Sequence, residues 1–321
     1  MCGTSGYLLH FPSLKRLFYG RLFFCVKILI TALLLGVLLV ILNPLRLWNN
    51  LFDIDPFLIG MALLLGVVGV LVQWIKWQHL LQFYYPEITW SEGLKSLLIG
   101  FALGLVSPGR LGELGRGLFL EGDRAALVGL AAADRCSSFV VTLAAAWVGF
   151  LVLFPTAALC LFIAAIGLGA LAYWAGKRVG RSLHQWAYTG RIWKVFKDIP
   201  PGLWGKVLAW SIVFNFTFFL QFYILLNNWG KPPLEGIWGI PVIFGLKALL
   251  PLSFLDLGVR EGAAVLVYSQ IGIDPAPAFN AAFLLFVINV FLPSSMGLAL
   301  IQRHWGLWRG MHQGKKRYIS L

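Results

Sequence analysis

The sequence predicts an all-α, polytopic membrane helix bundle with about six full spans and two re-entrant broken-helix hairpins. Of its 321 residues, 59% are hydrophobic and 12% are charged, whereas soluble domains carry roughly 25% charged residues. The apolar stretches have the length of membrane helices and show no alternating pattern, which argues against a barrel. No soluble-looking block is long enough to form another domain. We therefore expect residues 1–321 to make one integral membrane domain.

Apolar stretches of about twenty residues give the six expected spans: 22–42, 57–75, 125–154, 157–174, 207–226 and 278–301. The first follows basic residues but is too long for a signal peptide and has no clear cleavage site, so it is expected to be retained. After the second span, Lys76, Trp77, His79 and the pair Tyr84-Tyr85 predict an interfacial belt.

Two further apolar segments, 94–120 and 237–268, are interrupted where a membrane helix would need to continue. The part of the first segment before Pro108 is shorter than the ~20 residues needed to cross. Proline and glycine interrupt helices, and irregular backbone at membrane depth must be covered by protein or water. The expected breaks are at Pro108, Gly109 and Gly112 in the first segment and at Pro251 and Gly258 in the second.

Basic residues predict the orientation. The formal net charge is +13, and the lead-in 1–21, the loop 176–206 and the tail 302–321 are basic. Cytoplasmic loops of membrane proteins are rich in Lys and Arg. This rule places both termini and the 176–206 loop in the cytoplasm. If both broken segments crossed instead, 176–206 would face outward.

In this orientation the outward connections are 43–56, the turn at Pro155, 228–236 and 269–277. The basic loop is expected to hold an amphipathic surface helix near 180–197. No nucleic-acid partner is expected, because positive-inside bias explains the charge and no recognition motif is present.

The order of these segments suggests an inverted-topology repeat. The second span, the first hairpin and the span at 125–154 form one unit, and the span at 207–226, the second hairpin and the last span form another. The two units enter from opposite sides of the membrane. Transporters commonly use such repeats and place their binding site where broken helices meet.

Charged residues within the apolar bundle give the candidate site. Arg110, Glu113 and Arg116 follow one another at intervals of three, so each can reach the next on a helix. The candidate set contains the arginines Arg110, Arg116, Arg135 and Arg260 and the acids Glu113, Asp134, Asp256 and Glu261. Either these residues are structural ion pairs, or the arginines bind a phosphate headgroup while the acids orient them or act as a gate.

No catalytic or cofactor motif accompanies these charges. The sequence lacks GxSxG and P-loop motifs and has no His/Cys cluster with metal-ligand spacing, so we expect no cofactor and no metal. Its four cysteines form no CxxC pair and are interpreted as small core residues.

Three short motifs carry a resemblance to a known family. They are Pro108-x-Arg110-x-Gly112-Glu113-x-x-Arg116, Asp134-Arg135, and Gly258-Val259-Arg260-Glu261 followed by Gly272. The chain resembles the membrane domain of the lysylphosphatidylglycerol synthase/flippase family from about residue 22 to 301, with Asp134 where the family often has Glu. The resemblance implies a multi-span inner-membrane protein that binds or translocates a lipid. Members that make aminoacylated lipid carry a soluble catalytic domain after the membrane part, so that synthesis is expected to be absent here.

Three functions remain open at this stage. The first is a flippase-like protein that recognises an anionic phospholipid or polyprenyl-phosphate-type headgroup. The second is a membrane lipid-pyrophosphate phosphatase, although Ser107 and Ser253 are the only hydroxyls near the motifs. The third is a partner that presents lipid to a lipid-modifying enzyme or glycosyltransferase. Membrane lipids are the expected partners, a non-enzyme is favoured, and the oligomeric state is not predicted.

Overall fold

The computed structural model describes residues 28–29, 31–158, 187–229, 232–250 and 257–302. Every regular element in this part of the chain is a helix, as expected from the sequence. Pro251 and Asp256 lie outside the described residues, as do almost all of the predicted span at 157–174, the lead-in and most of the tail.

The first half of the bundle starts with a bent pair of helices, Thr31–Leu42 and α2, which meet at Asn43 with a bend of 83°. Asp55, Thr89 and Asp123 cap the next three α-helices by accepting hydrogen bonds from backbone N–H groups in the first turn. The elements of this half are α2 (Pro44–Phe52), α3 (Pro56–Tyr84), α4 (Trp90–Val106), the 3₁₀ helix η1 (Pro108–Phe119) and α5 (Arg124–Leu153).

The second half repeats this order. Its elements are α7 (Ala187–Asp198), α8 (Pro201–Asn227), α9 (Leu234–Leu249), α10 (Val259–Gln270), α11 (Pro275–Phe286) and the π-helix η2 (Val287–Phe291). Helix α11 continues through η2 to Gln302 as one apolar span. As in the first half, a long helix is followed by a broken pair and then by another long helix.

Four helices in the described part of the chain are long and apolar enough to cross a membrane: α3, α5, α8 and Pro275–Gln302. A fifth is reached if Thr31–Leu42 and α2 count as one span. Helix α3 extends nine residues beyond the predicted end at Ile75. The interfacial belt predicted at Lys76 and Trp77 is therefore wrong, since both side chains are buried in the core.

Helix α4 and η1 fold back on each other as a hairpin, as the break at Pro108 predicted. Ser107 turns the chain, and its hydroxyl accepts a 2.6 Å hydrogen bond from the Gly112 N–H. Farther from the tip, Ser96 of α4 donates to the Arg116 backbone oxygen across the hairpin. The 3₁₀ conformation brings residues three apart onto one face. Gly109, Gly112 and Gly115 therefore lie on one side of η1.

We expect Gly112→Ala to destabilise this hairpin strongly. A Cβ at this position would lie 2.1 Å from the backbone oxygen of Leu103, which cannot move away without shifting α4. Overpacking of this kind costs about 1–3 kcal/mol, which thermal unfolding in detergent would measure. Gly202→Ala is the matched control, because nothing lies within 4 Å of its new methyl group. Equal melting temperatures for the two variants would contradict the close packing.

Helices α9 and α10 form the second hairpin, as predicted from the break between Pro251 and Gly258. The Tyr268 hydroxyl donates to the Gly236 backbone oxygen, and Gly239 lies against Val267. Gly258 precedes α10 with a φ of 83°, a conformation that glycine adopts without a steric penalty.

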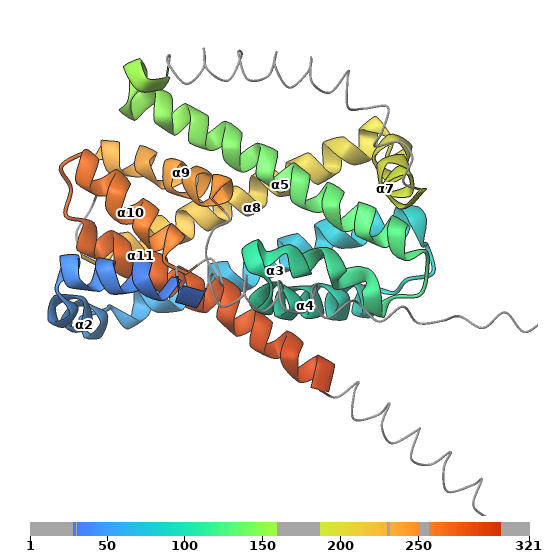
Figure 1. Ribbon diagram of the computed structural model, residues 1–321, viewed down its shortest axis with the longest axis horizontal. Coiled ribbons are helices and arrows are strands. Elements are labelled where there is room, and N and C mark those ends of the chain that lie inside the picture. The colour runs from blue at the N-terminus through green and yellow to red at the C-terminus, as the bar shows by residue number, and fades with distance from the viewer. Residues whose placement is uncertain (1–27, 30, 159–186, 230–231, 251–256, 303–321) are drawn as a thin grey trace, which may run out of the picture.

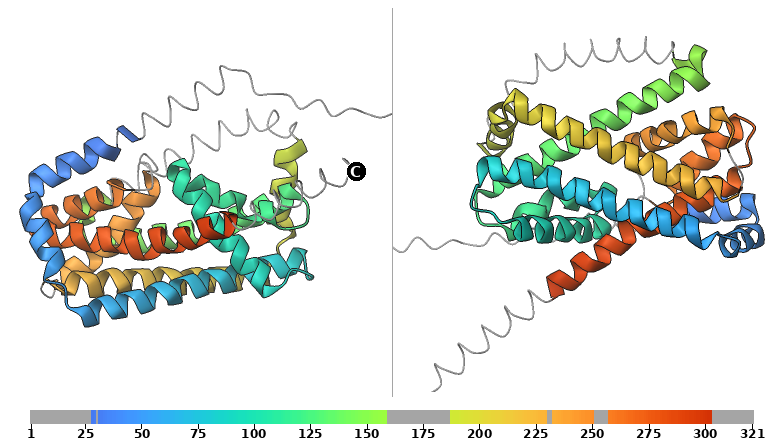
Figure 2. Two further views of the ribbon diagram at one scale, coloured as in Figure 1. Left: turned by 90° about the horizontal axis from the view of Figure 1, so that it is seen from below. Right: turned by 180° about the vertical axis from the view of Figure 1, so that it is seen from behind.

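The two halves pack around the antiparallel pair α3 and α8, which lie side by side along the molecule (Figure 2). Asp55 at the start of α3 donates its N–H to Asn228, and Tyr84 at the end of α3 bonds Asp198 just before α8. An inverted repeat requires this antiparallel arrangement. Each half has its own buried core, one centred on α3, α4 and α5 and the other on α8 to α11 (Figure 1).

The predicted outward connections gather at one end of the bundle. There Arg46 pairs with Asp274, and the Trp229 indole donates to the Asn50 backbone oxygen. At the opposite end α7 packs on α5 (Figure 1). Val195 of α7 is buried and Trp193 is exposed, as expected for the amphipathic helix. The structure groups the loops as the charge pattern predicted. Which end faces the cytoplasm stays a prediction.

Candidate functional site

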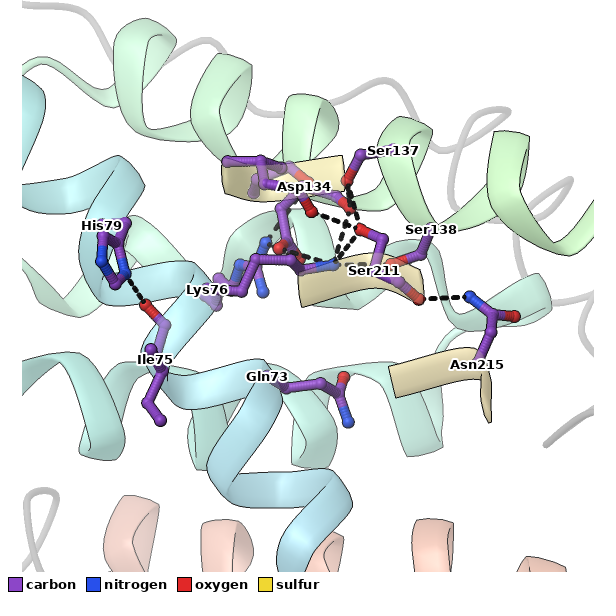
Figure 3. Close-up of polar contacts among 12 residues, drawn as sticks. Gln73, Ile75, Lys76, His79, Asp134, Ser137, Ser138, Ser211 and Asn215 are labelled. Atoms are coloured by element: carbon purple, nitrogen blue, oxygen red, sulfur yellow. Dashed lines mark hydrogen bonds and ion pairs between the residues drawn. The ribbon is translucent and has the colours of Figure 1, made fainter. Parts of the chain in front are cut away.

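Asp134 lies at the centre of a buried ionic network between α3, η1 and α5 (Figure 3). One carboxylate oxygen lies 3.0 Å from Lys76 Nζ, and the other accepts a 2.7 Å hydrogen bond from Arg116 Nη2. The guanidinium of Arg116 stacks on Trp77, with its central carbon 3.9 Å from the ring centroid. The side chains of Lys76 and Arg116 are only 1% and 3% exposed. Both cations therefore depend on one carboxylate.

Hydroxyl groups complete the surroundings of the Lys76 ammonium. Nζ donates to Ser138 Oγ at 2.6 Å and lies 3.3 Å from Ser211 Oγ on α8. Ser211 in turn lies 3.0 Å from Ser137. A buried ammonium needs oxygen atoms around its three N–H bonds. The first half supplies the charges, and α8 adds only neutral groups to this network.

Glu113 forms a second cluster, which we call the Glu113 cluster, with Arg110 and Arg135. Arg110 pairs with one carboxylate oxygen, and Arg135 Nη1 lies 3.1 Å from the other. Arg135 also donates to the Arg110 backbone oxygen, so η1 and α5 are joined twice. Arg135 is 33% exposed, which makes this cluster accessible where the Asp134 network is closed.

The backbone of Arg110 is strained. Its φ of 55° places it in the left-handed region, which residues other than glycine rarely adopt. The Arg110 Nε is buried and has no hydrogen-bond partner among the described residues. Strained residues and unsatisfied buried donors are uncommon and concentrate at functional sites. The Glu113 cluster shows both features at one residue.

The two clusters lie next to each other at the junction of η1 and α5. Asp134 and Arg135 are neighbours in α5 but point to different clusters, and Arg116 lies within electrostatic range of Glu113. The meeting of the two broken segments at one site stays a prediction.

Arg260 and Glu261 form a third group apart from these clusters. Their side chains are 3% and 0% exposed and 3.0 Å apart, and Glu261 also accepts the Gly258 N–H at 2.8 Å. The Arg260 guanidinium lies 5.7 Å from the Phe286 ring centroid in α11. Glu261 therefore caps the start of α10, and neither charge of the pair is accessible.

The predicted site residues therefore fall into three groups. Arg110, Glu113 and Arg135 share the accessible cluster, Arg116 and Asp134 share the buried network, and Arg260 and Glu261 stand apart. Their role in headgroup binding stays a prediction, and the exposure of Arg135 favours the first group. Lys76 was missed because a lysine at the end of an apolar run normally marks the interface. Its position opposite Asp134 depends on tertiary packing.

Among the residues that the structure describes, no three His, Cys, Asp or Glu side chains are grouped as metal ligands would be. The chemistry available at the Glu113 cluster is instead that of guanidinium groups. These form paired, charge-assisted hydrogen bonds with planar or tetrahedral anions.

Comparison with known proteins gives one match. A family model described as the lysylphosphatidylglycerol synthase TM region matches residues 24–297, which include every helix in which the candidate charges lie. No curated protein and no solved structure matches the chain.

Proposed function

Because the chain belongs to the lysylphosphatidylglycerol synthase TM region family, we propose that it binds the anionic headgroup of a membrane lipid at the Glu113 cluster and moves that lipid across the bilayer. The ligand would be a phospholipid or a polyprenyl-phosphate-type lipid. Arg110 and Arg135 would bind the phosphate, and Glu113 would hold the two guanidiniums in place between binding events.

The unequal sharing of charge is the observation that carries this proposal. Across the two clusters, four cations (Lys76, Arg110, Arg116 and Arg135) share the carboxylates of Glu113 and Asp134 within the described part of the bundle. Excess positive charge inside an apolar bundle is costly unless it is paired or hydrated. A phosphate would supply the missing negative charge. Guanidinium groups also match its geometry better than lysine does.

Charge competition explains how such a site could release its ligand. Each guanidinium pairs with Glu113, so an arriving phosphate would replace a carboxylate instead of meeting unpaired cations. Exchange between two anions costs less than exposing a buried charge. A binding site for transport needs this balance, because a ligand held too tightly would not leave.

We expect Arg110→Gln/Arg135→Gln to lose phosphate-bearing lipid that co-purifies with the wild type. Each buried charge-assisted hydrogen bond contributes about 1.5–3 kcal/mol, so the bound fraction should fall at least tenfold. Native mass spectrometry with lipid identification measures this fraction. Arg46→Gln is the matched control, because Arg46 pairs with Asp274 on the exposed end of the bundle. Identical lipid profiles in folded wild type and double variant would contradict the proposal.

The same preparations test the phosphatase alternative. Phosphate release from a lipid diphosphate, lost in Glu113→Gln, would favour an enzyme. The nearby Ser107 hydroxyl is already used inside the hairpin, where it accepts the Gly112 N–H and donates to the Gly104 backbone oxygen. This hydroxyl stabilises the turn between α4 and η1.

A further inference from the structure

The two halves share individual contacts as well as the order of their elements. Lys76 lies twenty residues after the start of α3, and Gln221 lies twenty residues after the start of α8. Ser138 lies fourteen residues into α5, and Asn289 lies fourteen residues after Pro275 in the final span. Lys76 donates to Ser138 at 2.6 Å, and Asn289 donates to Gln221 at 2.7 Å.

Neighbouring contacts follow the same correspondence. Ser211 lies ten residues after the start of α8, and Gly66 lies ten residues after the start of α3. Ser211 contacts Lys76, and a Cβ on Gly66 would lie 3.4 Å from the Gln221 amide. Contacts reproduced at equal offsets identify Lys76 and Gln221 as equivalent positions of the repeat.

The equivalent position shows what the fold itself requires there. In the second half Gln221 is 1% exposed and fully neutral, and it bonds Asn289 and the Ala62 backbone oxygen. A neutral amide pair therefore suffices to join the long helices at this depth. The charges of Lys76, Asp134 and Arg116 in the first half go beyond this requirement. Burying them is costly, so packing alone does not account for them.

From this asymmetry we infer that Lys76 is a positioning residue of the proposed anion site, supplying positive charge behind Arg110 and Arg135. The inference rests on the proposed function. Lys76 is too buried to touch a ligand, but its network lies against the Glu113 cluster, since Asp134 and Arg135 are adjacent in α5. Charges interact more strongly in a low-dielectric interior than in water. Lys76 would thus favour an anion at the guanidiniums and, through its pair with Asp134, position α5 against α3.

The test replaces the charged contact of the first half with the neutral amide pair found in the second half. Lys76→Gln/Ser138→Asn copies the Gln221–Asn289 pair and leaves Asp134 paired with Arg116 alone. We expect this variant to unfold within about 3 °C of the wild type. Its affinity for phosphatidylglycerol in phosphatidylcholine nanodiscs should be about tenfold lower, as expected for losing one charge in the interior. Lys76→Gln alone gives the same expectation without added volume.

Two further variants separate charge from packing. Lys76→Arg keeps the charge and should bind within about threefold of the wild type, although its side chain fits the pocket less well. Gln221→Ala should do the reverse, lowering the melting temperature while leaving the affinity unchanged. Lys95→Gln, on the exposed face of α4, is the matched lysine control.

Each outcome decides between the alternatives. Wild-type affinity in Lys76→Gln/Ser138→Asn, beside lost affinity in Arg110→Gln/Arg135→Gln, would overturn the role of Lys76 and leave the proposed function standing. Unfolding of the Lys76→Gln variants would also overturn it, because the charge would then be needed for the fold. Weak binding by Lys76→Arg would likewise overturn the role of Lys76. No binding by the wild type, or full binding by Arg110→Gln/Arg135→Gln, would instead refute the proposed function.

Discussion

Asp134→Asn is expected to destabilise the fold so strongly that little folded protein is obtained. The substitution keeps the shape of the side chain but removes the one carboxylate that Lys76 and Arg116 share. Both cations would then lie in the core without a counter-charge. Breaking a buried ion pair by removing one partner costs about 3–5 kcal/mol, a large part of the total stability of most domains. Thermal unfolding and the yield of monodisperse protein in detergent measure the loss.

A second substitution tests this explanation. Adding Lys76→Gln to Asp134→Asn removes one of the two stranded cations, so part of the lost stability should return. Lys76→Gln alone should change stability little. A double variant no more stable than Asp134→Asn would show that the loss has another cause, such as a disturbed contact to the backbone of α5.

Glu261→Gln is the second substitution with a large expected effect. Glu261 is 0% exposed, pairs with the buried Arg260, and caps α10 by accepting the Gly258 N–H. The amide can still accept that N–H but cannot neutralise Arg260. We again expect a loss of about 3–5 kcal/mol, seen as a lower unfolding temperature. Lipid binding at the Glu113 cluster should persist in whatever protein remains folded.

Arg46→Ala provides the contrast for Glu261→Gln. Arg46 and Asp274 also form an ion pair, but their side chains are 57% and 41% exposed. Exposed pairs contribute about 0–1 kcal/mol, because water and salt already screen the charges. Similar losses in Arg46→Ala and Glu261→Gln would mean that burial does not decide the strength of these pairs.

The breaks and spans were predictable because local chemistry determines them. Pro108 cannot donate a backbone hydrogen bond and is followed by Gly109, and Gly258 adopts a positive φ, so a helix break is favoured at both places. Long apolar runs likewise form spans regardless of their neighbours. The charge rule also placed the outward connections at one end of the bundle, because it depends on composition and not on contacts.

Which charged side chains pair with one another could not be predicted from the sequence. Arg110 and Arg116 are equally spaced from Glu113, yet Arg116 turns to Asp134 and stacks on Trp77. Adjacent helical residues point about 100° apart, which sends Asp134 and Arg135 to different clusters. The 3₁₀ form of η1 depends on how closely its glycines pack on α4. These outcomes depend on tertiary packing.

All charges of the buried Asp134 network come from the first half of the chain, and this affects how the protein is inserted during synthesis. Lys76, Arg116 and Asp134 are synthesised before α8 exists, and α8 later contributes only hydroxyl and amide groups to them. Proteins fold from the N-terminal end during translation. The nascent chain can therefore neutralise its most costly side chains while α8 to α11 are still on the ribosome. Insertion of α8 then adds only neutral hydroxyl and amide groups to a network whose charges are already paired.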